Sequence, residues 1–231
     1  MRRTRHGNAH PRITVVAVTL DARTMPRDLL IEEVARVIFA GGTIIFPNDT
    51  SYGLACDPLR LDAVDRIYLQ KRRPDHKPLT LHIAGVAELL EYAPGNVVAA
   101  TVAKRLLPGP VTLLVARPSF ISEEITAGQP TMGVRVPDEP LARAILDRCG
   151  PLAVSSANAS GDPPYRGRGG SERLPAADLI VENGPTRYDG EAAIVDCTRE
   201  RPLVLREGTL SFELIEARLG VAERHVVKAR K

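Results

Sequence analysis

Apolar residues follow a helical spacing in some stretches of the chain and form short continuous runs in others. In residues 26–42, "PRDLLIEEVARVIFAGG", the side chains of Leu30, Val34 and Ile38 recur every four residues, and two glycines end the stretch. The next residues, "TIIFP" (43–47), form an apolar run of strand length. The pattern therefore predicts a helix that leads directly into a strand.

The same alternation continues toward the end of the chain. Further predicted strands cover 78–83, 111–116, 132–137, 151–154, 178–182, 192–197 and 203–207. Further predicted helices cover 61–71, 86–92, 95–107, 139–148 and 211–219. Several late strands follow one another without a helix, which argues against a purely parallel sheet. We expect an α/β (α+β) fold with a mixed parallel and antiparallel sheet, in one domain over 13–217.

Positive charge is concentrated at the two ends of the chain. Residues 1–12 carry four arginines and no acid, and residues 218–231 carry a net +4. Because the whole chain is at +3, residues 13–217 are left at −5, which argues against a non-specific duplex binder. With 4% aromatic residues and no Trp, a stacking platform for single strands is not favoured either. We expect 1–12 and 218–231 to be basic flexible tails, either simply solvated or in weak contact with RNA.

The three cysteines, Cys56, Cys149 and Cys197, are far apart and form no C-x-x-C pair. This argues against a disulfide framework and against a zinc knuckle, and is typical of a reducing compartment. No apolar segment of signal-peptide length follows the basic N-terminus, and no apolar run reaches the roughly 18 residues of a membrane helix. We therefore expect a cytoplasmic protein that makes no membrane contact.

Small polar residues follow two of the predicted strands. "GPLAVSSANASG" (150–161) sets hydroxyls, an amide and a glycine after strand 151–154, and "PNDTSYGLACD" (47–57) follows strand 43–47. Such residues build ordinary polar turns, and they also build anion sites in which backbone N–H groups approach a phosphate. Both stretches are candidates for a ligand site, because open α/β sheets bind ligands beyond their strand ends.

The segment "KRRPDHK" (71–77) crowds five basic residues into seven positions, with stiffening prolines within it and directly after it. It either holds a polyphosphate, with Arg as a bidentate fork and Lys as a point charge, or is a charge run that faces water. Lys71 and Arg73 lie at or past the end of helix 61–71, where we expect stability to depend little on them.

Two polar residues interrupt apolar strands. Arg135, in "MGVRVP", needs an anionic partner on a half-buried sheet, and that partner is either an acid of this protein or a substrate carboxylate. His82, in "LTLHI", is either a core histidine bonded to backbone or part of a site.

Several common motifs are absent from the sequence. There is no P-loop and no G-x-G-x-x-G, so any nucleotide is held in another way. There is no G-x-S-x-G around Ser155 or Ser156, and the spacing of His76 and His82 is not that of a zinc site. We expect no resident metal site.

Eight segments, taken together and in chain order, resemble the YrdC/Sua5 family of threonylcarbamoyl-AMP synthases. They are "FPNDTSYGL", "KRRPDHKPLTLHI", "LPGPVTLLV", "GVRVPDEP", "SSANASG", "DLIVENGP", "AIVDCT" and "LVLREGTL". The resemblance runs from about residue 30 to 210, and the family's K-x-R and S-x-N signature falls on Lys71 and Arg73 and on Ser156 and Asn158. Since the chain ends soon afterwards, we expect the short form of the family.

The resemblance implies a twisted mixed sheet around a basic cavity. It implies a reaction of L-threonine, bicarbonate or CO2, and ATP that gives threonylcarbamoyl-AMP and pyrophosphate. The product serves the tRNA modification N6-threonylcarbamoyladenosine (t6A), so the partner is the t6A transferase machinery. Mg2+ is expected on the phosphates, and positioning with charge neutralisation supplies most of the catalysis.

The resemblance also implies roles for single residues. Those expected to hold threonine are Thr50, His82 and Arg135. Those expected along ATP are Lys71, Arg73, Lys77, Thr131, Ser156, Asn158 and Arg206, with Lys71 and Arg73 as the catalytic pair.

The chain departs from the family at two places. Ala192 and Ala193 replace a Ser-Thr pair of the family pattern E-S-T-V-V-D, and "DPPYRGRGG" lacks the common Ser-Pro-Thr run. Two alternatives therefore stay open. One is a non-catalytic or altered YrdC/YciO-type paralogue that binds RNA or nucleotide, and the other is a carbamoyl-adenylate enzyme that uses another amine or carbamoyl donor.

Overall fold

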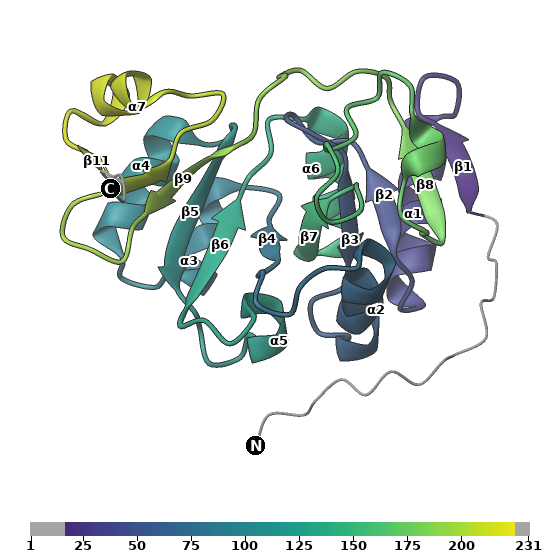
Figure 1. The fold of residues 1–231 in the computed structure, drawn as a ribbon, viewed down its shortest axis with the longest axis horizontal. Coiled ribbons are helices and arrows are strands. Elements are labelled where there is room, and N and C mark those ends of the chain that lie inside the picture. Colours follow the sequence, from purple (N-terminus) through teal and green to yellow (C-terminus); the bar gives the residue numbers. More distant parts are fainter. Residues whose placement is uncertain (1–16, 225–231) are drawn as a thin grey trace.

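A computed structural model describes residues 17–224, and one twisted sheet runs through this region (Figure 1). Its strands are β1 (Val18–Asp21), β2 (Ile44–Phe46), β3 (Gly53–Cys56), β4 (Thr80–His82), β5 (Val111–Ala116), β6 (Thr131–Arg135), β7 (Leu152–Ser156), β8 (Leu179–Glu182), β9 (Ala193–Asp196), β10 (Leu203–Arg206) and β11 (Glu223–Arg224). The helices are α1 (Arg27–Phe39), α2 (Leu61–Lys71), α3 (Leu89–Tyr92), α4 (Val97–Leu106), α5 (Glu123–Thr126), α6 (Pro140–Cys149) and α7 (Phe212–Leu219), with 3-10 turns at Val86–Glu88 and Ser171–Arg173.

The sheet is mixed, which confirms the expected fold class. Its strand order is β1-β8-β2-β3-β7-β4-β6-β5-β9-β10-β11. β2 runs antiparallel to β3, β3 and β4 each run antiparallel to β7, and β4 runs parallel to β6. β9 and β10, which follow one another without a helix, are antiparallel, in line with the expectation that the sheet is not purely parallel.

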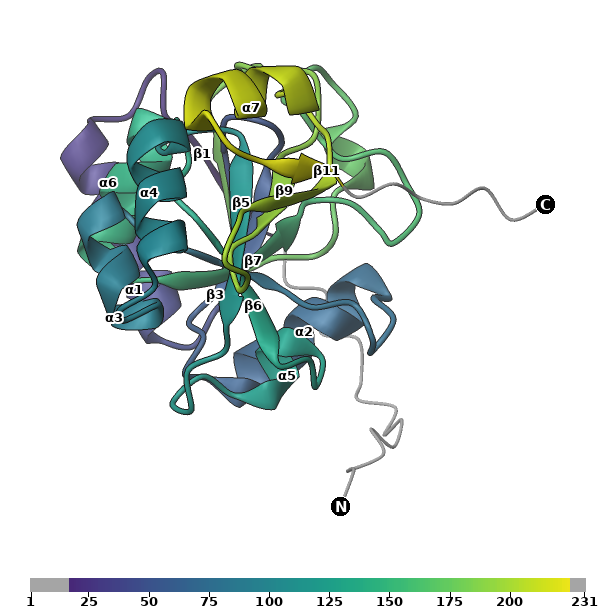
Figure 2. The same cartoon turned by 90° about the vertical axis from the view of Figure 1, so that its left-hand side faces the viewer.

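Helices cover the sheet unevenly. Figure 2 shows α1, α3, α4 and α6 gathered on one side. α1 and α6 bury their apolar stripes with alternate residues of β2, Ile44 and Phe46, in one core cluster. Ile45 points the other way and joins a second, larger cluster with α2, α4 and α7. Since successive strand residues face opposite sides, β2 contributes to both cores.

Two boundaries near the polar stretches differ from those that the sequence predicts. β3 is absent from the predicted strands, because "GLAC" has no β-branched residue and follows a polar turn; it forms by antiparallel pairing with β2 and β7. Strand 151–154 is longer than predicted: β7 continues to Ser156, because Leu54 and Gly53 of β3 pair with Ser155 and Ser156. Both serines therefore belong to a strand, and the turn begins after them.

The predicted domain boundary at 217 falls inside α7, which runs to Leu219 with a buried end. Beyond it, β11 adds to the sheet edge, where Glu223 pairs with Leu203 of β10. The C-terminal tail predicted from residue 218 is wrong up to Arg224, and its remainder and the predicted tail 1–12 lie outside the described residues. Among the helices between residues 17 and 224, none is long and apolar enough to cross a membrane.

Candidate functional site

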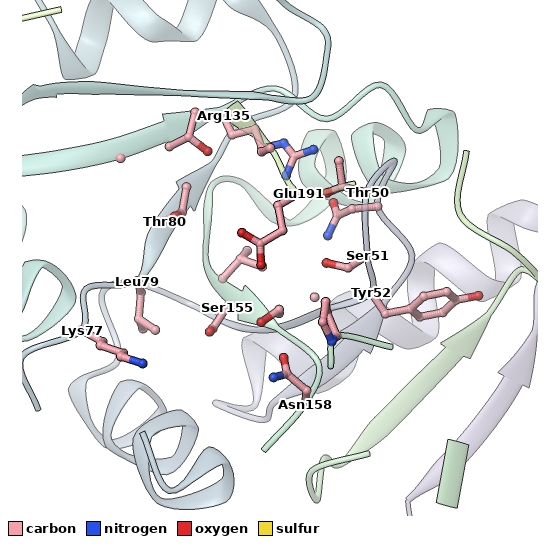
Figure 3. Close-up of a pocket in the computed structure, with 18 of the residues that line it drawn as sticks. Thr50, Ser51, Tyr52, Lys77, Leu79, Thr80, Arg135, Ser155, Asn158 and Glu191 are labelled. Atoms are coloured by element: carbon pink, nitrogen blue, oxygen red, sulfur yellow. The ribbon is translucent and has the colours of Figure 1, made fainter. Parts of the chain in front are cut away.

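A cavity of about 550 Å³ opens on one face of the central sheet (Figure 3). Alternate residues of neighbouring strands form its floor: Thr80 and His82, Thr112 and Leu114, Gly133 and Arg135, Val154 and Ser156, and Ala192 and Ile194. The residues between them, such as Leu81 and Val134, point into the core on the other face. A Cβ on Gly133 would crowd Thr112 and Thr80, so glycine keeps the floor open there.

The cavity is strongly basic. Its cationic lining residues are Lys71, Arg73, Lys77, Arg135, Arg166 and Arg206. Its carboxylates are Asp162 and Glu191. Six basic side chains against two carboxylates, with His82 neutral, make the cavity suited to a polyanion. The expected basic cavity is therefore present although residues 13–217 are acidic as a whole.

The loop between β2 and β3 forms one end of the cavity. Asn48, Asp49 and Thr50 are all buried, and the backbone is held from outside by hydrogen bonds. The Tyr188 N–H donates to the Asp49 carbonyl at 2.8 Å, and the Arg166 Nε donates to the Thr50 carbonyl at 3.2 Å. The loop is thus a fixed wall rather than a plain turn.

Arg135 has an acid of this protein as its partner. Its Nη2 lies 2.5 Å from the Asp49 Oδ1, and both side chains are buried. The Arg135 Nε, the Asp49 Oδ2, the His82 Nδ1 and the Asn48 Oδ1 are also buried, and within residues 17–224 they have no hydrogen-bond partner. Buried polar groups are rarely left unpaired, so this end of the cavity is built to meet a polar ligand.

His82 lies opposite Arg135 in the parallel ladder between β4 and β6. Burial, with the nearby Arg135 charge, lowers the pKa of His82 well below its usual range. The imidazole is therefore neutral at pH 7 and offers one N–H and one acceptor nitrogen.

Lys71 is the last residue of α2, and it points inward with 1% of its surface exposed. Its Nζ donates to the Ser156 carbonyl and, at 2.5 Å, to the Asn158 carbonyl. The Ser160 N–H donates to the Lys71 carbonyl at 2.9 Å. Lys71 thus holds the turn after β7 in place, and its burial argues against the expectation that stability depends little on it.

Burial, reinforced by the charges of Arg73 and Lys77, lowers the pKa of Lys71 to about 7. Arg73 is also tied to backbone, since its Nε and Nη2 donate to the carbonyls of Lys77 and Pro78 at 3.1 and 2.7 Å. Lys71 and Arg73 are therefore folded parts of the cavity wall, while Arg72, His76 and Lys77 of the same segment are exposed.

The turn after β7 completes this wall. The Asn158 Nδ2 donates to the carbonyls of Ala159 and Asp162, at 2.8 and 2.7 Å, which closes the turn on itself. Because Lys71 occupies the backbone carbonyls of Ser156 and Asn158, the Ser156 hydroxyl is left for the cavity, which Ser156 lines.

Arg206 and Glu191 form the opposite wall. The Arg206 Nη1 lies 2.8 Å from the Glu191 Oε2, and its Nη2 donates to the Ala192 carbonyl at 2.8 Å. The Ala192 side chain lines the cavity and has no hydroxyl to offer. Figure 3 shows Arg135, Thr50 and Glu191 gathered at one end of the cavity, with Lys77 and Asn158 toward the other.

Nine of the ten predicted site residues line this cavity, and Thr131 does not. Thr131 lies at the start of β6, on the same face as Gly133 but one step further from the cavity. The structural roles of Asp49, Arg166 and Glu191 were not predicted. Their neighbours in sequence are typical turn residues, and nothing in the local pattern indicates that a distant strand lies against them.

No group of three or more His, Cys, Asp or Glu side chains that suits a metal ion is found between residues 17 and 224. All three cysteines are free, and two of them, Cys56 and Cys197, are buried. Burial raises the pKa of both thiols to about 12, so they are unreactive core residues.

Comparison with known proteins places the chain among relatives of this architecture. Residues 36–208 match the family model of Sua5, YciO and YrdC, which is described as "Telomere recombination". The threonylcarbamoyl-AMP synthase of Bacillus subtilis is 36% identical over 198 residues, which cover 84% of this chain and 57% of that protein. The Pyrococcus abyssi enzyme of the same name is 33% identical and is covered to 63%. The chain thus spans less than two thirds of these two relatives.

Two solved structures are similar in fold. The crystal structure of P. abyssi Sua5 complexed with L-threonine has a TM-score of 0.79 at 32% identity, and the match covers 91% of this chain and 62% of that one. E. coli YciO has a TM-score of 0.74 at 26% identity, and the match covers 86% of this chain and 98% of that one. On the family match and these similarities, the chain belongs to the Sua5/YciO/YrdC family.

Proposed function

We propose that this protein is a threonylcarbamoyl-AMP synthase, which condenses L-threonine, bicarbonate or CO2, and ATP to threonylcarbamoyl-AMP and pyrophosphate. One observation carries the proposal: a single cavity combines a row of cations with a separate buried end at which four side-chain polar atoms have no hydrogen-bond partner within residues 17–224. The names of the B. subtilis and P. abyssi relatives, and the solved complex of P. abyssi Sua5 with L-threonine, support the same reaction.

The cationic part of the cavity suits the triphosphate. Arg73, Lys77 and Arg206 line it, and the Ser156 hydroxyl is left free of the contacts that fix its backbone. A cavity of about 550 Å³ lies within the usual range for small-molecule sites, about 300–1,000 Å³. Lys71 is assigned to this site chiefly as the residue that holds the turn from Ser156 to Ser160.

The buried end suits an amino acid. The free edge of Arg135 is offered to a carboxylate, while Asp49 fixes the guanidinium from the other side. Neutral His82 and the Thr50 hydroxyl are suited to the remaining polar groups of threonine. Arg135 would therefore be both an internal ion-pair partner and a ligand residue.

The chemistry then needs no covalent intermediate on the protein. The amine of threonine forms a bond to the carbon of CO2 and loses a proton to water, which gives a carbamate. A carbamate oxygen attacks the α-phosphorus of ATP, and the bond to pyrophosphate breaks as its electrons leave with that group. The protein aligns the two substrates and neutralises charge on the phosphates.

We propose that Mg2+ enters with ATP. The carboxylates of Asp162 and Glu191 are the acidic ligands that line the cavity, and Mg2+ commonly uses one or two carboxylates together with phosphate oxygens and water. When bound, the ion would supply charge neutralisation on the phosphates. The small number of acidic ligands is compatible with an ion that is held mainly by its nucleotide.

A second candidate is a family member that uses another amine or has lost catalysis. Ala192 favours it, because this cavity residue offers no hydroxyl where the synthases of the family are expected to have one. The fold similarity to E. coli YciO is compatible with it as well. Both candidates predict ATP binding, but only the synthase is expected to release pyrophosphate in response to threonine.

The deciding experiment measures pyrophosphate release from ATP and Mg2+, with threonine and bicarbonate each present or withheld. Release that requires both substrates supports the synthase. ATP binding without threonine-dependent release contradicts it and favours the second candidate. Under the synthase proposal, the product passes to the t6A transferase machinery in the cytoplasm. Weak contact of the chain ends with RNA is a separate proposal. Measuring tRNA binding in low salt would test it.

A further inference from the structure

Arg166 carries no assigned role, yet its side chain lines the cavity at the end formed by the β2–β3 loop. It lies in "DPPYRGRGG", a segment whose proline and glycine content is typical of a surface loop. In the structure this segment is partly exposed, and Asp162, Pro164 and Arg166 of it also line the cavity.

The backbone on both sides of Arg166 is firmly held. The Tyr52 N–H donates to the Tyr165 carbonyl at 2.9 Å, and the Thr186 N–H donates to the Arg166 carbonyl at 3.0 Å. Gly167 has a φ of 71°, and a Cβ there would overlap the Gly184 carbonyl oxygen. Only glycine fits this close approach, so the position of Arg166 relative to the cavity is fixed by its neighbours.

The guanidinium of Arg166 is oriented but not neutralised. Its Nε donates to the Thr50 carbonyl at 3.2 Å, which leaves the two Nη groups without a hydrogen-bond partner in residues 17–224. Of the other cavity arginines, Arg135 pairs with Asp49 and Arg206 pairs with Glu191, while Arg73 donates to the backbone carbonyls of Lys77 and Pro78 at the other end of the cavity. Within the same residues, Arg166 has no carboxylate within ion-pair distance.

Arg135 and Arg166 are attached to consecutive residues of one loop, Asp49 and Thr50. The charge of Arg135 is already balanced by the buried carboxylate of Asp49. The charge of Arg166, in the same cavity, is not balanced. An oxyanion at this end of the cavity therefore gains a net countercharge only from Arg166. The planar fork of arginine suits both a carboxylate and a phosphate, which it binds through two parallel hydrogen bonds.

We propose that Arg166 binds a substrate oxyanion, either the carboxylate of the amino acid or a phosphate of the nucleotide, through its two free Nη groups. The inference deepens the proposed function, because it names a ligand residue of the same cavity. The inference can be tested without turnover, because the binding of each substrate can be measured separately.

The test compares Arg166→Gln and Arg166→Lys with the control Arg168→Gln. Arg168 lies two residues away, is exposed, and pairs with Asp189 outside the cavity. Calorimetry measures the dissociation constants of ATP with Mg2+ and of threonine for each variant, and thermal unfolding checks its fold. Glutamine retains a donor for the Thr50 carbonyl but removes the charge, and lysine retains the charge but loses the fork.

We expect Arg166→Gln to weaken binding of one ligand at least tenfold, Arg166→Lys to weaken it less, and Arg168→Gln to change neither ligand by more than twofold. Weaker ATP binding assigns a phosphate, and weaker threonine binding assigns the carboxylate. Unchanged affinity for both ligands in folded Arg166→Gln overturns the inference, and if that variant does not fold, unchanged affinity in Arg166→Lys does so. Loss of the proposed function is recognised separately, as ATP binding without pyrophosphate release in the parent protein.

Discussion

The guanidinium Nη2 of Arg135 lies 2.5 Å from the Asp49 Oδ1, although 86 residues separate the two in the chain. Asp49 is completely buried and Arg135 is 6% exposed, so neither charge is compensated by water. This pair joins the loop after β2 to the end of β6, and it fixes the edge of Arg135 that remains for a ligand.

Asp49→Asn is expected to destabilise the protein by about 3–5 kcal/mol, because it leaves the buried charge of Arg135 without its partner. Chemical denaturation measures the free energy of unfolding. Adding Arg135→Met to Asp49→Asn is expected to recover part of the loss, since the unpaired charge is then removed. A loss below about 1 kcal/mol in Asp49→Asn would show that the pair is a weak contact of the kind seen on surfaces.

Arg135→Lys is expected to raise the threonine concentration required for half-maximal pyrophosphate release at least tenfold, with a smaller effect on ATP. Lysine keeps the charge beside Asp49 but cannot reproduce the bidentate fork. Initial rates with each substrate varied in turn separate the two requirements. Equal effects on both would mean that Arg135 acts only through the ion pair that holds the loop.

Lys71→Ala is expected to cost at least about 2 kcal/mol of stability, because the backbone carbonyls of Ser156 and Asn158 lose their buried donor. Pyrophosphate release is expected to fall at least tenfold with it, as the turn after β7 loses its anchor. Lys77→Ala is the matched control for stability, since Lys77 lines the same cavity but is exposed at the surface. An unchanged denaturation profile in Lys71→Ala would contradict the anchoring role.

Stability is expected to rise with pH between about 7 and 9, with a contribution from Lys71. Its pKa is lowered to about 7 in the folded protein, from an ordinary value of 10.5. In this window the unfolded chain binds the proton and the folded protein has released it, so raising the pH favours the folded state by up to about 1.4 kcal/mol per unit. Denaturation at pH 7, 8 and 9 should give a steeper slope for the parent than for Lys71→Met, and equal slopes would oppose the assignment.

Ala192→Ser is expected to increase threonine-dependent pyrophosphate release several-fold, because it adds a hydroxyl to the cavity wall beside Arg206. Ala192 is only 6% exposed, but its side chain reaches the cavity, so the added group meets the ligand rather than the core. A decrease in release would indicate a pocket built for another amine. Ala193→Ser is the control, since its side chain is completely buried and does not line the cavity.

The sequence pattern predicted most of the strands that bear β-branched residues and the helices with a clear apolar stripe, but it missed β1, which contains Val18 and Thr19. β5 and α2 have the bounds expected for them, 111–116 and 61–71. β3 escaped prediction because its residues gain strand conformation only from their pairing with β2 and β7. Local propensity contains no information about such partners.

The candidate site was predictable where a polar residue interrupts an apolar strand, as His82 and Arg135 do. The inward direction of the Lys71 side chain could not be predicted, because a lysine at a helix end is ordinarily solvated. Its burial depends on the turn that begins at Ser156, 85 residues later, and packs over it. Arg166 shows the same limit: its neighbours predict a loop, while the carbonyl of Thr50, 116 residues earlier, orients its side chain at the cavity.

The strand order has a consequence for how this protein is made. β8 lies between β1 and β2, so these two strands, which precede the other described strands in the chain, are joined only when residues 179–182 have been synthesised. Until then β1 has no neighbour among the described strands, and one edge of β2 presents unpaired backbone groups, which are templates for pairing with another chain. The nascent chain therefore exposes these edges until residue 182 has been synthesised, and unpaired strand edges favour aggregation during that interval.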